Sequence, residues 1–380
     1  MQPTVYLDYA ATTPVDPRVA EAMRPYLTER FGNASSAYAL GRDAASVLAG
    51  ARGRLAVGIG AVGPDEVVFT SCGTESDNMA VIGLATAGGR SAGHVVVSAF
   101  EHPAVLEPAR WLARHGFELT ELAPHADGTV YPDDLAAALR DDTILVSVMH
   151  ANNELGTVQP IAELAAVAHE RGALFHTDAA QSLGKIDLDV TATGIDAASF
   201  AGHKIYAPKG TGFLYLKRGT PIAPYLMGGG QESGLRSGTS NVAGAEALAT
   251  ALELMNAERP TEAPRLKALR AHLEDALVAW AEGVRITVAE APERLPHLTH
   301  ALVPGPIGNA LLAHLDAAGI AVSAGSACSA GDHAASHVLA AIGCPAELAS
   351  GSLRVSLGRF TTPGDVEYLI DTLAAIGQGG

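Results

Sequence analysis

The run TILVSVM, residues 143–149, is the most informative stretch of this 380-residue sequence. It is apolar and β-branched without alternation, which is typical of a strand buried on both faces of a sheet. Similar strands are expected at 94–99 (HVVVSA) and 173–177, and helical patterns at 103–115 and 160–171 separate them along the chain. Because parallel strands are joined by helical crossovers, the alternation predicts an α/β fold with a mostly parallel sheet covered on both sides.

The pattern changes after Asn241. Two Ala- and Leu-rich helical stretches are expected at 242–257 and 264–282, followed by the shorter elements of a smaller α+β unit. The segment Met255–Pro264 (MNAERPTEAP) contains two prolines and is the expected hinge between them. We therefore predict a large domain at 13–257 and a small domain formed by 1–12 and 258–380.

The composition excludes several classes of protein. With 25 Lys and Arg against 41 Asp and Glu, the formal net charge is −16, which disfavours binding to nucleic acid or anionic lipid. The three cysteines form no C-x-x-C pair, which favours a reducing compartment and argues against a structural zinc site. No secretory signal and no apolar run of about 20 residues is found, so we expect a cytoplasmic protein without a membrane span or a bound metal.

Three segments place polar residues where predicted strands end. TSCGTES (70–76) opens a helix, so its free N–H groups and the Thr74 hydroxyl form a candidate phosphate site. HTDAAQS (176–182) ends its strand at Asp178, which by itself is as readily a helix cap as a ligand-binding carboxylate. SFAGHKIYAPKGTG (199–212) presents Lys204 at a glycine turn, either as an exposed loop residue or as an amine with a lowered pKa suited to Schiff-base chemistry.

Together the three segments are far more specific than each alone. A phosphate site, a carboxylate and a lysine at three strand ends of one sheet are the groups that bind pyridoxal phosphate. In such a site the lysine carries the cofactor. The carboxylate keeps the ring nitrogen protonated, so that the ring accepts electrons.

A fourth segment, AGSACSAG (324–331), surrounds Cys328 with small residues. Structural cysteines are usually covered by apolar side chains, which this segment lacks. By itself the pattern fits a structural cysteine as well as a nucleophile carried by a mobile loop.

The chain resembles the cysteine desulfurases of the nitrogen-fixation and iron–sulfur-cluster type, in the class-V aminotransferase branch of the fold-type-I pyridoxal-phosphate enzymes. The resemblance runs from YLDYAATTP (6–14) to SLRVSLGRFTT (352–362). Between these ends lie, in the family's order, GNASS (32–36), TSCGTESDN (70–78), EHPAVL (101–106), NNELGTVQP (152–160), DAAQSLGK (178–185), AGHKIYAPKG (201–210), LRSGT (235–239) and GSACSAG (325–331). The resemblance implies a homodimer, L-cysteine as substrate and a sulfur-acceptor protein as partner.

The resemblance also implies a role for each matching residue. Lys204 would carry the cofactor, Cys328 would accept sulfur, and His102 would stack on the ring and move protons. Contacts to the cofactor are implied for Gly73, Thr74, Asn153, Asp178, Gln181 and His203, and, from the second subunit, for Thr239. Substrate contacts are implied for Asn33, Asn153 and Arg354, of which Arg354 would bind the substrate carboxylate through two parallel hydrogen bonds.

The sequence departs from the family pattern at several positions. Ala201 stands where the family usually has Ser, which removes a hydroxyl from the phosphate site, and Cys72 replaces a usual Gly. Ala34 and Tyr38 replace a usual Pro and His, and 21 residues follow Arg359, fewer than in many relatives. These differences bear on cofactor affinity and on the choice of partner.

The expected activity is conversion of L-cysteine to L-alanine with transfer of sulfur to Cys328 as a persulfide. The sulfur would serve iron–sulfur cluster synthesis or the synthesis of another sulfur-containing biomolecule. Two alternatives stay open: a selenocysteine lyase or sulfide-releasing C–S lyase of the same fold, and a weakly catalytic partner protein in a sulfur-transfer assembly.

Overall fold

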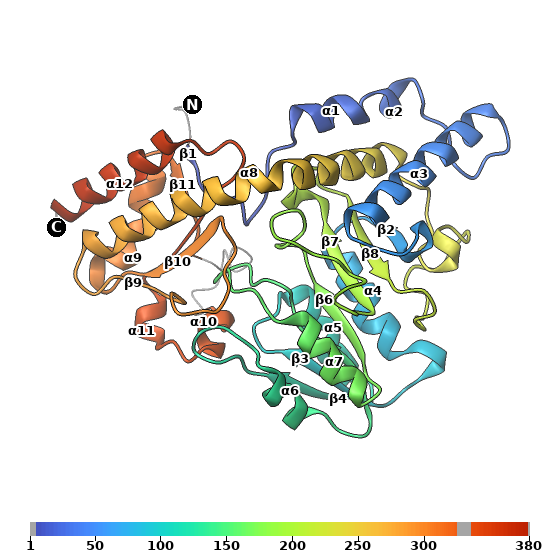
Figure 1. Cartoon of the computed structure of the whole chain (residues 1–380), viewed down its shortest axis with the longest axis horizontal. Helices are drawn as coiled ribbons and strands as arrows, with labels where there is room; N and C mark the ends of the chain where they lie inside the picture. Colours follow the sequence, from blue (N-terminus) through green and yellow to red (C-terminus); the bar gives the residue numbers. More distant parts are fainter. Residues whose placement is uncertain (1–4, 325–335, 379–380) are drawn as a thin grey trace.

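A seven-stranded sheet forms the centre of the computed structural model, which describes residues 5–324 and 336–378 (Figure 1). In spatial order its strands are β2 (Val67–Thr70), β8 (Gly212–Leu216), β7 (Ala197–Ala201), β6 (Leu174–Asp178), β5 (Thr143–Ser147), β3 (His94–Ser98) and β4 (Glu118–Leu122). The pairs from β7 across to β4 are parallel, and β8 pairs antiparallel with both of its neighbours. The expected α/β class and mostly parallel sheet are confirmed.

Helices cover both faces of this sheet. On one face, α4 (Gly73–Ala85) and α5 (Pro103–Ala113) share an apolar core with the strands. On the other face, α3 (Ala39–Gly58), α7 (Ile161–Glu170) and the first half of α8 form a second core with them. The shorter helices of this region are α1 (Pro17–Met23), α2 (Pro25–Thr28) and α6 (Pro132–Ala138).

A smaller α+β unit follows. An antiparallel sheet has the order β12 (Ser352–Ser356), β10 (Leu298–Leu302) and β9 (Arg285–Ile286), and β1 (Val5–Tyr6) pairs in parallel with β11 (Ile320–Ala321). Its helices are α9 (Gly305–Ala317), α10 (His337–Ala341), α11 (Ala346–Ala349) and α12 (Pro363–Gln378). The division into domains at residues 12/13 and 257/258 stays a prediction, which the separate core around Leu7, Leu273 and Leu353 supports.

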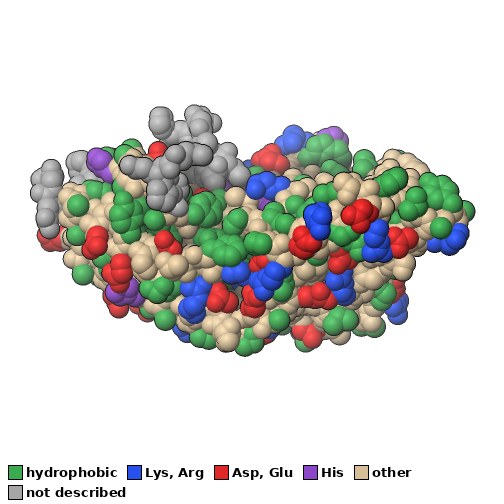
Figure 2. Space-filling model, turned by 90° about the horizontal axis from the view of Figure 1, so that it is seen from above, with side chains coloured by type: hydrophobic (Ala, Val, Ile, Leu, Met, Phe, Trp, Pro, Cys, Tyr) green, Lys and Arg blue, Asp and Glu red, His purple; other side chains and the backbone are tan. Residues whose placement is uncertain are grey.

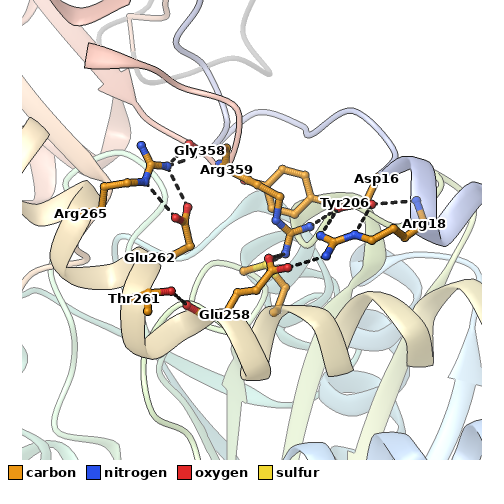
Figure 3. Close-up of polar contacts among 10 residues, drawn as sticks. Asp16, Arg18, Tyr206, Glu258, Thr261, Glu262, Arg265, Gly358 and Arg359 are labelled. Carbon is orange, nitrogen blue, oxygen red and sulfur yellow. Dashed lines mark hydrogen bonds and ion pairs between the residues drawn. The ribbon is translucent and has the colours of Figure 1, made fainter.

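The expected interruption at Met255–Pro264 is wrong, because α8 runs without a break from Val242 to Trp280 and links the two units (Figure 1). Pro260 and Pro264 remove two backbone donors from this helix. Tertiary contacts hold the turn that contains them, as Figure 3 shows: Glu258 pairs with Arg18 and Arg359. Contacts with distant segments therefore outweigh the local preference of proline to end a helix.

Arg359 joins three segments at this junction. It pairs with buried Asp16 at 2.5 Å and with Glu258 at 2.6 Å, and its guanidinium lies 4.5 Å from the centre of the Tyr206 ring. The neighbouring Arg18, which bonds to the same carboxylate, is the main reason that the pKa of Asp16 falls to about 2.

Replacing Arg359 with methionine should lower the free energy of unfolding by about 3 kcal/mol, because it leaves the Asp16 charge buried with one partner fewer. Arg24→Met is the matched control, since Arg24 pairs with Glu21 on the exposed surface, and we expect a loss below about 1 kcal/mol. Urea denaturation followed by circular dichroism measures both. Equal losses in the two variants would contradict the importance of the buried junction.

The surface seen in Figure 2 carries acidic and basic side chains that are interspersed with apolar ones. Among the described residues visible on this face, the basic side chains do not form a continuous stripe of the kind that tracks a phosphate backbone. Within the described ranges, none of the helices is both long and apolar enough to cross a bilayer.

Candidate active site

A cavity of about 340 Å³ lies where β5, β6 and β7 end, between the two units. Open α/β sheets bind ligands at this edge. Most of the implied site residues line it: Gly73, Thr74, His102, Asn153, Asp178, Gln181, His203, Lys204 and Arg354. The resemblance is thus matched by a spatial cluster of residues from distant parts of the chain.

Lys204 ends a single helical turn, Gly202–Lys204, that directly follows β7. Its side chain is half-buried, and Nζ donates to the carbonyl oxygens of Ala10 at 2.5 Å and Ala11 at 2.8 Å. The amine is thereby directed into the cavity instead of into solvent. The interpretation of Lys204 as an exposed loop residue is wrong.

Asp178 ends β6 and is 7% exposed. Its Oδ1 accepts a hydrogen bond from the Ala180 N–H at 2.9 Å, so the residue caps a turn and also lines the cavity. Burial raises the pKa of this carboxyl, and the charges of His102 and Lys204 act in the opposite direction. Those two groups favour a carboxylate that faces the cavity.

His102 precedes the first turn of α5, and its Nδ1 accepts from the Ala104 N–H at 3.1 Å. In the neutral ring this contact places the proton on Nε2. Burial lowers the pKa of His102, which favours the neutral imidazole. A neutral, oriented ring is suited to stacking and to proton exchange.

The candidate phosphate site is the start of α4, which begins at Gly73 within the motif TSCGTES. A Cβ on Gly73 would lie 3.1 Å from the Cβ of Ala201, so a side chain here would crowd Ala201 and force it to move. His203 completes the rim: its Nδ1 is 3.1 Å from Thr12 Oγ1, and burial together with nearby Lys204 lowers its pKa to about 4. The site therefore offers α4 N–H groups and a neutral imidazole to an anion.

Arg354 lies in β12 and is 1% exposed. Its Nη1 donates to the backbone oxygen of Asn153 at 2.9 Å, and its Nη2 donates to Asp8 Oδ1 at 2.7 Å. The guanidinium is thus held in place at the wall of the cavity. Arg354 is therefore a buried residue and not a surface arginine at a strand end.

Two implied site residues of the described part of the chain, Asn33 and Thr239, do not line this cavity. Asn33 is exposed in the turn before α3, where its Oδ1 accepts from the Ser35 N–H. Thr239 lines a different hollow, together with Ser71 and Gly212. Cys328 lies outside the described residues.

Sequence reasoning missed two buried carboxyls near Asp178. Asp77 lies one turn after Thr74 in α4 and lines the cavity, a placement that their spacing in the motif TSCGTESDN allows. Glu101 accepts from the Met149 N–H at 2.5 Å, and burial raises its pKa to about 8. Burial raises the pKa of Asp77 as well. Among the three, Asp178 is the one whose carboxylate form both His102 and Lys204 favour.

The residues fit pyridoxal phosphate. A half-buried amine, a buried carboxyl and a helix N-terminus surround one cavity, and these are the groups that the cofactor requires. Ala201 lines the cavity with a methyl group where the family usually has the hydroxyl of Ser, and Cys72, directly before α4, also lines it. The described residues contain no cluster of three His, Cys, Asp or Glu side chains able to bind a metal.

Known proteins agree with this geometry. The family described as "Aminotransferase class-V" matches residues 5–369. A relative from Dictyoglomus turgidum, named cysteine desulfurase IscS, is 46% identical over 99% of this chain and 95% of its own length. A relative of the same name from Methanosarcina thermophila is 43% identical over 98% and 92% of the two chains. A solved "NifS-like protein" is 35% identical with a TM-score of 0.93 and covers 100% of both chains.

The family match covers nearly the whole chain, and the curated relatives exceed 40% identity over almost their full length. The fold of the solved NifS-like protein also matches this one from end to end, with a TM-score of 0.93. The chain therefore belongs to the class-V aminotransferase family, and within it to the cysteine desulfurases.

Proposed function

We propose that this protein is a pyridoxal-phosphate-dependent cysteine desulfurase, which converts L-cysteine to L-alanine and retains the sulfur as a persulfide on Cys328. One observation carries the proposal: Lys204, Asp178 and Arg354 come from three distant segments and line one cavity. The names of the two curated relatives support the same reaction.

When bound, the cofactor supplies a carbonyl for Schiff-base chemistry and a ring that withdraws electrons. Asp178 would pair with its ring nitrogen and Gln181 with its ring oxygen, while His102 stacks on the ring face. The α4 N-terminus at Gly73 and Thr74, with His203, would hold the phosphate. Asn153, which also lines the cavity, would contact cofactor and substrate.

Arg354 would bind the substrate carboxylate. Its guanidinium is nearly inaccessible to solvent and already oriented by Asn153 and Asp8. A charge-assisted pair of hydrogen bonds in such a place is stronger and more specific than on the surface. Substrate amines that lack a carboxylate would therefore be rejected.

Lys204 would move the substrate α-proton, because its Nζ is held at the cavity wall by the Ala10 and Ala11 carbonyls. Cys328 as a thiolate would then attack the substrate sulfur. The bond between the β-carbon and sulfur of the substrate breaks and a sulfur–sulfur bond forms on Cys328. The β-carbon takes up one proton to become the methyl group of alanine, and the α-carbon takes back the proton it lost. Atoms and electrons balance without an external oxidant, since the carbon is reduced as the sulfur is oxidised.

Alanine formation from L-cysteine, measured with and without dithiothreitol, tests this function. We expect one equivalent of alanine without reductant and continuous turnover with it, because the persulfide must be discharged. Cys328→Ser should lose alanine formation but still bind the cofactor. Cys344→Ser is the control, because Cys344 follows α10, where its Sγ is 3.7 Å from the Pro345 oxygen.

Four results would overturn the proposal in whole or in part. Continuous release of sulfide by Cys328→Ser would identify a C–S lyase, and a strong preference for L-selenocysteine would identify a selenocysteine lyase. Labelled sulfur found on Cys72, which lines the cavity, would show that Cys72 and not Cys328 carries the persulfide. If neither L-cysteine nor L-selenocysteine gives alanine, the protein is better explained as a weakly catalytic partner in a sulfur-transfer assembly.

We further propose a homodimer in which Thr239 and Asn33 reach the partner's cavity. Large apolar side chains are exposed near these residues, including Phe31 at 66%, Tyr38 at 61% and Met227 at 83%. A mixture of Lys204→Ala and Thr239→Ala subunits places both lesions in one site and leaves the other site intact. Failure of the mixture to regain activity over either parent would contradict shared sites.

The discharged sulfur requires an acceptor protein, which we propose to be an iron–sulfur scaffold or another sulfur carrier. A cytoplasmic location follows from the expectation of reduced cysteines and stays part of the proposal. Co-purification of the persulfide form with a candidate acceptor, followed by transfer of labelled sulfur, tests the first point. Fractionation of the cells that make the protein tests the second.

A further inference from the structure

Gln181 has both ends of its side-chain amide engaged by the protein. Its Nε2 donates to the Ala10 oxygen at 2.9 Å, and its Oε1 accepts from Lys185 Nζ at 3.2 Å. A carbonyl oxygen only accepts and a lysine nitrogen donates, so the two contacts determine which end of the amide is nitrogen. One hydrogen of Nε2 is committed to Ala10, and the second points elsewhere.

The turn that carries Lys185 is held firmly against α8. Gly184 has a φ of +68°, and a Cβ there would lie 2.6 Å from the Met255 Cβ. The Lys185 N–H also donates to the Ser182 oxygen at 3.0 Å. These contacts fix the position of the Lys185 backbone and so restrict the directions that its side chain can take.

The Lys185 side chain lies between two cavities. Gln181 lines the active-site cavity, whereas Lys185 lines a second one behind Lys204, together with buried His297 and Arg359. Burial and the charge of Lys204 lower the pKa of Lys185 to about 7. Both the ammonium and the neutral amine carry hydrogens, so the contact with Gln181 persists in either form.

We propose that Lys185 is a positioning residue, which holds Gln181 so that the second hydrogen of its amide nitrogen is donated to the ring oxygen of pyridoxal phosphate. This inference rests on the proposed function, because it requires that cofactor in the cavity. It gives Lys185 a task distinct from that of Lys204: Lys204 donates to the Ala10 oxygen directly, whereas Lys185 reaches Ala10 only through the Gln181 amide.

The effect appears in the cofactor's absorption spectrum as a function of pH. A hydrogen-bond donor to the ring oxygen withdraws electron density from that oxygen. The nitrogen that would link the cofactor to Lys204 lies beside this oxygen and then loses its proton more easily, so its pKa falls. Lys185→Met keeps the stem but loses the donor, so the midpoint of the spectral titration should rise. The dissociation constant of pyridoxal phosphate should increase about fivefold.

A double-mutant cycle separates this contact from the charge of Lys185. In a Gln181→Leu background, Lys185→Met should shift the spectral midpoint far less than in the wild type, because the two residues act through one hydrogen bond. Lys185→Arg, which keeps a donor, should retain the wild-type midpoint. Lys217→Met removes a lysine at the opposite end of β8 that pairs with Asp196, and should change nothing.

If Lys185→Met shifts the spectral midpoint equally in the wild type and in Gln181→Leu, Lys185 acts only through the electrostatic effect of its charge. This result would overturn the inference. If Lys185→Met does not fold, Gln181→Glu tests the other contact of the inference, the donation to the ring oxygen: it keeps the acceptor for Lys185 and replaces the donating Nε2 by oxygen. An unchanged midpoint in Gln181→Glu would equally overturn it. Failure of the wild-type protein to bind pyridoxal phosphate would instead refute the proposed function.

Discussion

Lys204→Ala should still bind pyridoxal phosphate but should form alanine about 10⁴-fold more slowly than the wild type, because it removes the group that moves the substrate proton. The amine is held at the cavity wall by the Ala10 and Ala11 carbonyls, at 2.5 and 2.8 Å, and the variant leaves those carbonyls in place. Cofactor binding through the α4 N-terminus and Asp178 should survive in weakened form. Single-turnover alanine formation measures the loss.

Borohydride reduction of the loaded wild-type protein supplies an independent check. The cofactor should be fixed to the peptide that contains Lys204. Lys185 is the serious competitor, since its pKa falls to about 7 and it lines a cavity that Lys204 also lines. Lys209→Ala serves as the control, because Lys209 is exposed in the same loop. Attachment to Lys185 would contradict the assignment of both lysines.

The sheet and the strand-end residues were predictable because both depend on local sequence. Apolar β-branched runs such as 143–149 specify buried strands, and polar residues at their ends necessarily meet at one edge of a parallel sheet. Asp178 and Lys204 follow from this rule. The reversed direction of β8 does not, because a short apolar strand has the same composition in either direction.

The part of the site built by the N-terminal segment was beyond local reasoning. Ala10 contacts Lys204 across 194 positions of sequence, and it does so through a backbone oxygen that no side-chain pattern reveals. Asp8 reaches Arg354 across 346 positions. The motif YLDYAATTP indicated the family but gave no sign that its carbonyls direct the candidate catalytic amine.

In α8 the local rule that proline ends a helix led to a wrong prediction, because contacts with distant segments outweighed it. Two prolines in ten residues favour an interruption. Glu258, which precedes Pro260, instead pairs with Arg18 and Arg359. Arg265, which follows Pro264, donates to the backbone oxygens of Thr361 and Gly358, so contacts on both sides tie that stretch to the rest of the chain. Such compensation is visible only once the fold has brought the partners together.

Asp178→Asn should lower the rate of alanine formation about 10²- to 10³-fold, because it removes the negative charge that keeps the cofactor ring protonated. The substitution separates this charge from the structural role of the residue. The Ala180 N–H donates to Oδ1 at 2.9 Å, and an amide oxygen accepts that bond as a carboxylate does. The thermal midpoint of unfolding should therefore stay close to that of the wild type while turnover falls.

The pH dependence of the residual activity distinguishes the charge from the cap. Burial lowers the pKa of His102, and the neighbouring Asp178 charge partly restores it. Without that charge the pKa of His102 falls further, so the neutral ring persists to lower pH and the acidic limb of the rate profile shifts to lower pH. An Asn variant with a near-normal rate and an unshifted profile would show that Asp178 serves only as a cap, since the cap is the one function that the amide retains.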